Sequence, residues 1–134
     1  MGTGTPFRLT EQAYLVLLAL TPEPLHGYAV ITAVKELSAG RTTLAAATLY
    51  GNLDRLTAAG LVAPAGESVV DGRLRRYYRI TDAGRGAAEA ETERLAALAA
   101  RAQAALRRRA AHGTQGGLAG GFAFGLATPA GGLA

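Results

Sequence analysis

The stretch from Ala47 to Arg79 constrains the fold more than any other part of this 134-residue chain. It combines a helical leucine pattern, a glycine stop and two extended runs that meet at an Asp-Gly pair. Leu49, Leu53 and Leu56 recur at helical spacing, which places three leucines on one face. Gly60 is a suitable end for this helix, because helices often end at a residue with a positive φ angle. The sequence therefore predicts a short helix followed by a β-hairpin.

The hairpin is predicted from Asp71-Gly72, which lies between two valines and a run rich in arginine and tyrosine. An Asp-Gly pair between extended runs is a strong short-range hairpin signal. Alternation on the second strand places Arg73 and Arg75 on one face, with Tyr77. Arg76 falls on the other face with Tyr78 and Ile80, so at least one basic row is expected to reach solvent.

Clustered arginines suit phosphate groups, because the guanidinium fork is planar and always charged. The alternative is a solvated edge strand that uses its charge to avoid pairing with another sheet. On the preceding helix, the face opposite the leucines is expected to carry Thr48, Asn52 and Arg55, which can form hydrogen bonds. The alternative for this helix is an ordinary surface helix with a solvated polar face.

A helix followed directly by a basic hairpin favours one fold class over these alternatives. In a winged helix-turn-helix, one element enters the major groove and another contacts the DNA backbone. The sequence therefore predicts a mainly α fold with a small β-hairpin, in a winged helix-turn-helix arrangement. Double-stranded DNA is the expected partner. The formal net charge of +4 is consistent with an anionic partner, although it does not distinguish nucleic acid from a membrane surface.

Thr10 to Leu20 is predicted to form a first, mostly buried helix. Residues Ala13 to Leu20 have the length of the apolar region of a signal peptide, but Glu11 directly precedes them and no small-x-small cleavage pattern follows. Thr10 is a good N-cap, and Glu11 suits the first turn beside the helix dipole. The run is too short to span a bilayer, so we expect no membrane partner.

A second helix is predicted from about His26 to Leu37, after a turn at Thr21–Leu25 that two prolines interrupt. His26 has no neighbours at metal-ligand spacing, so a role at the helix start or in packing is expected. The segment Ser38–Thr43 then connects to the third helix, and its polar side chains are candidates for contacts with the phosphate backbone. These candidates are Arg41, Thr42 and Thr43.

The chain after the hairpin divides into two parts. An alanine-rich segment over 82–111 has high helix propensity, and its apolar positions follow a 3.5-residue seam: Leu95, Leu98, Ala102 and Leu106. We expect a dimerisation helix; the alternative is a loosely docked, solvated single helix. Residues 112–134 have no charged side chains and many glycines, so we expect a disordered low-complexity tail, with contact to a membrane or partner through Phe122 and Phe124 as the alternative. The remaining part, 1–81, is the expected DNA-binding domain.

Several classes of function are excluded by what the sequence lacks. The chain has no cysteine, which excludes disulfides and cysteine-ligated metals and fits a reducing compartment such as the cytoplasm. Two isolated histidines offer no ligand cluster, and no phosphate-binding loop, dinucleotide fingerprint or nucleophile elbow is present. We therefore expect neither an enzyme nor a bound metal or cofactor.

The chain resembles the PadR family of transcriptional regulators, of the short type with a single C-terminal helix. The matching segments span about residues 13–86 and occur in the family's order and spacing. They are Leu25-His26-Gly27-Tyr28, Thr48-Leu49-Tyr50, Leu53-x-x-Leu56, Gly60-Leu61-Val62, Arg75-Arg76-Tyr77-Tyr78-Arg79-Ile80-Thr81 and Ala83-Gly84-Arg85. The chain departs from the family at Ala45-Ala46-Ala47, where Ser-Pro-Gly is common, and at Gly51 within the helix, so this helix is expected to begin less firmly.

The resemblance implies a homodimeric repressor that binds a pseudo-palindromic operator, with the third helix for recognition, the hairpin as the wing and the last helix as the dimer contact. It also leaves open a small hydrophobic effector that releases the repressor from DNA. The residues expected to bind DNA are Tyr28, Arg41, Thr42, Thr43, Thr48, Tyr50, Asn52, Arg55, Arg73, Arg75 and Arg76. The alternative is a winged-helix module that binds proteins and not DNA, for which a neutral or acidic wing is expected.

Overall fold

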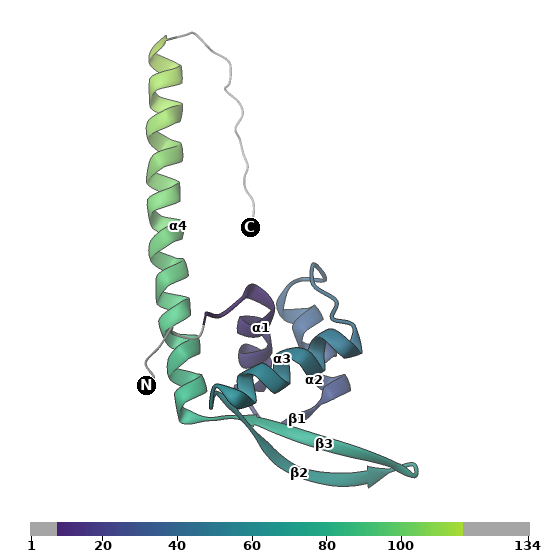
Figure 1. Cartoon of the computed structure of the whole chain (residues 1–134). Helices are drawn as coiled ribbons and strands as arrows, with labels where there is room; N and C mark the ends of the chain where they lie inside the picture. The colour runs from purple at the N-terminus through teal and green to yellow at the C-terminus, as the bar shows by residue number, and fades with distance from the viewer. Residues whose placement is uncertain (1–7, 117–134) are drawn as a thin grey trace. The chain divides into compact units, whose positions relative to one another are not determined.

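The computed structural model describes residues 8–116, with side chains for residues 8–110. In chain order the elements are α1 (Glu11–Leu20), β1 (Leu25–His26), α2 (Gly27–Leu37), α3 (Ala46–Ala58), β2 (Val62–Val70), β3 (Arg73–Ile80) and α4 (Asp82–Gly116) (Figure 1). The chain separates into two compact units within α4, one up to Glu93 and the other from Arg94. The predicted fold class, mainly α with a small β-hairpin in a winged helix-turn-helix and a long C-terminal helix, is confirmed.

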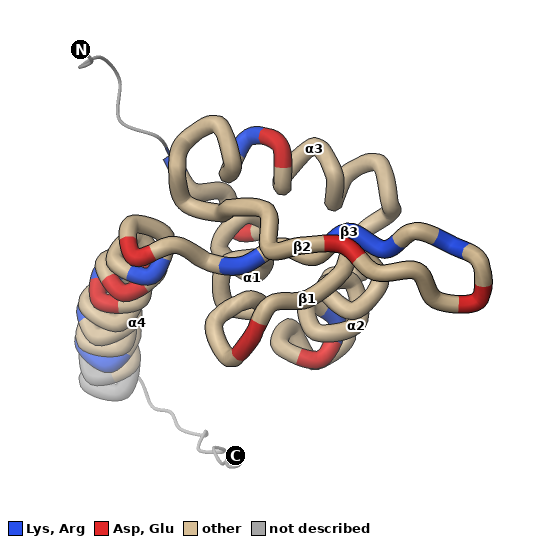
Figure 2. The backbone as a smooth tube through the Cα atoms, turned by 90° about the horizontal axis from the view of Figure 1, so that it is seen from below, with Lys and Arg blue, Asp and Glu red and all other residues tan. Residues whose placement is uncertain are grey.

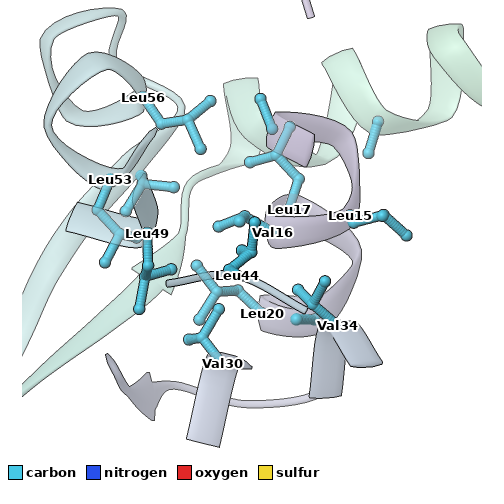
Figure 3. Close-up of a cluster of buried hydrophobic side chains, with 14 residues drawn as sticks. Leu15, Val16, Leu17, Leu20, Val30, Val34, Leu44, Leu49, Leu53 and Leu56 are labelled. Carbon is cyan, nitrogen blue, oxygen red and sulfur yellow. The ribbon is translucent and has the colours of Figure 1, made fainter. Parts of the chain in front are cut away.

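The core of the first unit lies between helices α1, α2 and α3, which are on the same side of the small sheet (Figure 1). Leu49, Leu53 and Leu56 are fully buried, which confirms the leucine face predicted for α3. They pack against side chains from the other helices and from the segment before α3. Figure 3 shows this cluster, which includes Leu15, Val16, Leu17, Leu20, Val30, Val34 and Leu44.

The sheet has three antiparallel strands in the order β1-β3-β2. Asp71 and Gly72 both have positive φ angles, of 52° and 75°, as a tight type I′ hairpin turn requires, so the predicted hairpin is confirmed. β2 contains a bulge between Pro64 and Glu67. A proline is tolerated there because β2 is an edge strand, where a backbone donor can be absent.

Strand β1 occupies the last residue of the predicted turn, Leu25, and the predicted start of the second helix, His26. Leu25 pairs with Tyr78 and His26 pairs with Tyr77, so two residues directly before α2 extend the sheet. Two residues are too few to show a periodic pattern. They form a strand only because β3 pairs with them. This pairing attaches the start of α2 to the hairpin.

Side-chain caps begin two of the helices. The backbone N–H of Ala13 donates to Oγ1 of Thr10 at 3.1 Å, which confirms the predicted N-cap of α1. Oγ1 of Thr81 accepts from the backbone N–H of Gly84 at 3.0 Å and donates to the Gly60 carbonyl at 2.7 Å. Thr81 therefore both caps α4 and ties its first turn to the end of α3. α3 begins at Ala46, and its N-cap residue Ala45 provides no side-chain cap, in agreement with the sequence.

Two glycines are required because neighbouring atoms occupy the space of a side chain. A Cβ on Gly27 would collide with the hydroxyl of Tyr50, and a Cβ on Gly84 would collide with the carbonyl oxygen of Leu61. Gly27 thus lets α3 approach the start of α2, and Gly84 lets α4 approach the connection between α3 and β2. The structure explains in this way why glycine stands at these two positions of the matching segments.

α4 begins within the first unit, where Ala88 is buried in the core. Near this position the hydroxyl groups of Tyr14 and Thr92 form a hydrogen bond of 2.7 Å. The helix ends at Gly116, five residues beyond the predicted end, and the remainder of the predicted tail, 117–134, lies outside the described residues. Within residues 8–116, no helix is long and apolar enough to cross a membrane.

Candidate nucleic-acid interface

The solvent face of α3 is displaced from the face predicted by the sequence. The buried residues of this helix are Leu49, Asn52, Leu53 and Leu56. With 3.6 residues per turn, the direction opposite their centre falls between Ala47 and Ala58, with Gly51 and Asp54 next to them on either side. Thr48 and Arg55 are exposed, but they lie at one side of this face and not at its centre.

The prediction that Asn52 lies on the exposed polar face is wrong, because only 2% of its surface is exposed. Its position, three residues after Leu49 and four before Leu56, falls inside a buried stripe wider than the three leucines alone indicate. The Asn52 Nδ2 donates to the Thr48 carbonyl oxygen at 3.0 Å, and Nη2 of Arg55 donates to Asn52 Oδ1 at 3.3 Å. Asn52 therefore holds the guanidinium group of Arg55 against the helix.

The other candidates around α3 differ in exposure. Tyr28, at the start of α2, is 75% exposed, and Tyr50 is 43% exposed although its hydroxyl lies against Gly27. In the connection before α3, Arg41 and Thr43 are exposed. Thr42 is half-buried, and its backbone N–H donates to Oγ of Ser38 at 2.9 Å. The structure thus brings these side chains to the surface near α2 and α3, with Thr42 the least accessible.

The pairing of β2 with β3 assigns each hairpin side chain to one of two faces. The helix-side face carries Arg76, Tyr78 and Ile80 on β3, and the latter two pack against the core. Its Arg76 lies 3.6 Å from the carboxylate of Glu67, which is the partner of Arg76 in the register. This face is therefore apolar near the core and carries an exposed ion pair farther along the hairpin.

The outer face of the hairpin carries Arg73, Arg75 and Tyr77, as alternation predicts, and Arg79 continues the same row. Figure 2, seen from below, shows the arginine positions along β3. Over residues 62–80, four arginines and two acidic residues leave a net charge of +2. The hairpin thus offers basic groups on both faces, with most of them on the outer one.

His26 joins the outer face through its pairing with Tyr77. The two rings form an edge-to-face contact, with centroids 5.5 Å apart and planes inclined by 70°. Burial, together with the positive charge of Arg75, lowers the pKa of His26 below its usual value. This packing role agrees with the sequence, which favoured a helix-start or packing function over catalysis. Among the side chains of residues 8–110, no cluster of three or more metal-ligating groups is present.

The helix-side face of the hairpin and the solvent face of α3 border the same region. Burial raises the pKa of Tyr78, and the nearby groups Tyr50 and Asp54 raise it further, whereas Arg76 opposes them. A groove of about 540 Å³ lies on the hairpin at Tyr78 and Arg76. Its lining residues are Pro64, Gly66, Glu67, Arg76, Tyr77 and Tyr78. Arg76 lines this groove, so a ligand seated in it would meet a positive charge.

The residues predicted for dimerisation lie in the second unit of the chain. Leu98 and Leu106 are 47% and 69% exposed, whereas Leu95 is half-buried and Ala102 is exposed. Large apolar side chains on a long helix favour contact with another surface.

Relatives with known sequences match more than half of this chain. A transcriptional regulator of Mycobacterium tuberculosis is 40% identical over 80 residues, which are 60% of this chain and 74% of that protein. An uncharacterised protein from a Streptomyces fradiae transposon is 42% identical over 94 residues, which are 70% of this chain. Those residues are only 26% of the length of the transposon protein, so this chain spans about a quarter of that relative.

Solved structures share the fold. A PadR family regulator from Eggerthella lenta has a TM-score of 0.57 at 30% identity, over 71% of this chain and 83% of that chain. One from Clostridium difficile has a TM-score of 0.60 at 23% identity, over 70% and 96% of the two chains. PadR of Bacillus subtilis, in complex with operator DNA, has a TM-score of 0.55 at 20% identity, over 62% of this chain and 47% of that chain.

The family model for PadR-like transcriptional regulators matches residues 16–90, more than half of the sequence. On this match, the chain belongs to the PadR-like family of transcriptional regulators.

Proposed function

We propose that this regulator binds double-stranded DNA in a sequence-specific manner and acts as a homodimeric repressor on a pseudo-palindromic operator. The observation that carries the proposal is the exposed face of α3 beside a basic hairpin on the same compact unit. The Bacillus subtilis relative, whose structure contains operator DNA, supports the same use of the fold.

In this proposal α3 enters the major groove and the hairpin contacts the backbone. Arg55, held by Asn52, and the exposed Thr48 are available to hydrogen-bond base edges or phosphate. Arg73, Arg75 and Arg76 supply positive charge from both faces of the hairpin. The hairpin is expected to add affinity for any sequence, whereas α3 discriminates between sequences.

The homodimer is proposed from the apolar seam of α4. Covering exposed leucines such as Leu98 and Leu106 with a partner subunit removes apolar surface from water and so stabilises the dimer. A two-fold dimer would place two α3 helices in half-sites about one helical turn of DNA apart. The double variant Leu95→Glu with Leu98→Glu should be monomeric by light scattering and should bind operator weakly. An unchanged dimer in that variant would show that the subunits meet elsewhere.

A small hydrophobic effector stays a prediction from the family resemblance. A groove of about 400 Å³ between α1 and the start of α4 is in the size range of ligand sites. Its lining includes Arg85, Glu89 and Glu93, so it favours an amphiphilic molecule over a purely hydrophobic one.

The proposal is tested by selecting binding sites from random double-stranded DNA and then titrating salt. The full chain should enrich a pseudo-palindromic sequence. Arg75→Ala should weaken binding to selected and scrambled DNA alike and reduce the salt slope by about 0.9 for each phosphate that the arginine no longer neutralises. Lys35→Ala removes a charge from α2, outside α3 and the hairpin, and serves as the control. Failure to enrich any sequence would instead favour the protein-interaction alternative.

A further inference from the structure

Asp54 stands out on the surface proposed to meet DNA, because it places a carboxylate near the centre of the solvent face of α3. Its side chain is exposed and, among residues 8–110, makes no ion pair. The nearest turns on the same face carry Ala47 and Gly51. These small residues allow the helix to approach a groove closely, and the carboxylate then extends beyond them.

A carboxylate in this place is unfavourable unless DNA offers it a donor. The DNA backbone is a dense row of negative charges, so an unpaired carboxylate near it is repelled. An ionised carboxylate can only accept hydrogen bonds. In the major groove the donors are the exocyclic amino groups of cytosine and adenine. Adenine also presents the acceptor N7 beside its amino group, which would oppose the second carboxylate oxygen, whereas cytosine presents its amino group as the sole polar group.

We propose that Asp54 determines part of the sequence specificity by accepting a hydrogen bond from the N4 amino group of a cytosine in the major groove. The inference rests on the proposed DNA-binding function and deepens it. Asp54 stabilises the complex when the base is cytosine. It weakens binding when the base is guanine or thymine, because their major-groove edges present acceptors that repel the carboxylate. The position it reads is in each half-site, because the two subunits are related by two-fold symmetry.

The test compares site selection from random double-stranded DNA by the wild-type chain, Asp54→Asn and Asp54→Ala. The wild type should require cytosine at one position of each half-site. Asp54→Ala should lose about tenfold or more of its discrimination there and bind scrambled DNA more tightly, because a negative charge is removed. Asp54→Asn should shift the preference towards adenine, which matches a carboxamide with two hydrogen bonds.

Glu36→Gln is the matched control, since it removes an exposed negative charge from α2 and not from α3. It should leave base preference unchanged. If the wild type enriches a sequence but both Asp54 variants keep the same preference at every position, the inference about Asp54 is wrong and the proposed function stands. If the affected position selects adenine in the wild type, the cytosine assignment is overturned. A wild type without any sequence preference would overturn the proposed function itself.

Discussion

Replacement of Asn52 by alanine separates a structural role from a base-reading role. The change removes the hydrogen bond from Asn52 Nδ2 to the Thr48 carbonyl and the acceptor that holds Arg55. A neutral hydrogen bond contributes roughly 0.5–1.5 kcal/mol to the free energy of unfolding, and the small space left in the helix interface adds to the loss. The contribution from the exposed Arg55 is discounted because solvent screens it.

We therefore expect Asn52→Ala to lower the free energy of unfolding by about 1–2 kcal/mol in total. For a domain of this size, each 1 kcal/mol corresponds to a fall in melting temperature of about 4–8 °C. Thr48→Ala is the matched control, since this exposed neighbour keeps its backbone carbonyl and should change stability by less than about 0.5 kcal/mol. Urea and thermal unfolding of both variants measure the difference.

We expect Asn52→Ala to change DNA binding only through Arg55, because the variant lacks the oxygen that accepts the hydrogen bond from this arginine. Asn52→Ala should weaken operator binding less than Arg55→Ala does, and it should leave the preferred sequence unchanged. A double-mutant cycle between the two residues should show coupling, because one holds the other. Wild-type stability together with an altered base preference would refute the reasoning, since it would mean that the Asn52 side chain leaves the core to read a base.

Three further predictions concern packing, titration and the C-terminal segment. Gly84→Ala should lower the free energy of unfolding by about 1–3 kcal/mol, because the new methyl group collides with the Leu61 carbonyl oxygen. Gly86→Ala has open space around it and should raise the free energy of unfolding by about 0.5–1 kcal/mol. Equal effects of the two changes in chemical denaturation would contradict this prediction. Because the folded-state pKa of His26 is lowered, the unfolded chain binds more protons just below pH 6.5, so stability should fall as pH drops through that value. His26→Asn should flatten the dependence of the melting temperature on pH between about 7.5 and 5.5, and an unchanged slope would exclude His26 as its source. A chain that ends at Ala111 should keep operator affinity within a few-fold, and a large loss would show that the removed segment contributes to binding.

The elements of the first unit could be predicted from the sequence because each has a strong local signal. Thr10 caps α1, the leucines of α3 repeat at helical spacing, and Asp71-Gly72 closes the hairpin. These signals depend on neighbours within a few residues, so no knowledge of the rest of the chain is needed. The ordered set of matching segments also indicated the family without any knowledge of the fold.

Strand β1 and the two required glycines depended on contacts between distant segments. Leu25 and His26 are extended because β3 pairs with them, some fifty residues later in the chain. Gly27 and Gly84 are glycines because Tyr50 and Leu61 approach them. Nothing in the residues next to these positions shows such an approach.

The same distinction applies to the candidate interface. The sequence by itself determined that an amphipathic helix precedes a basic hairpin, since helical period and turn chemistry are local properties. Only the tertiary structure decided which α3 side chains face solvent, because α1, α2 and the sheet cover a wider stripe than the three leucines. That packing buried Asn52, turned it into a support for Arg55, and left Asp54 near the centre of the exposed face.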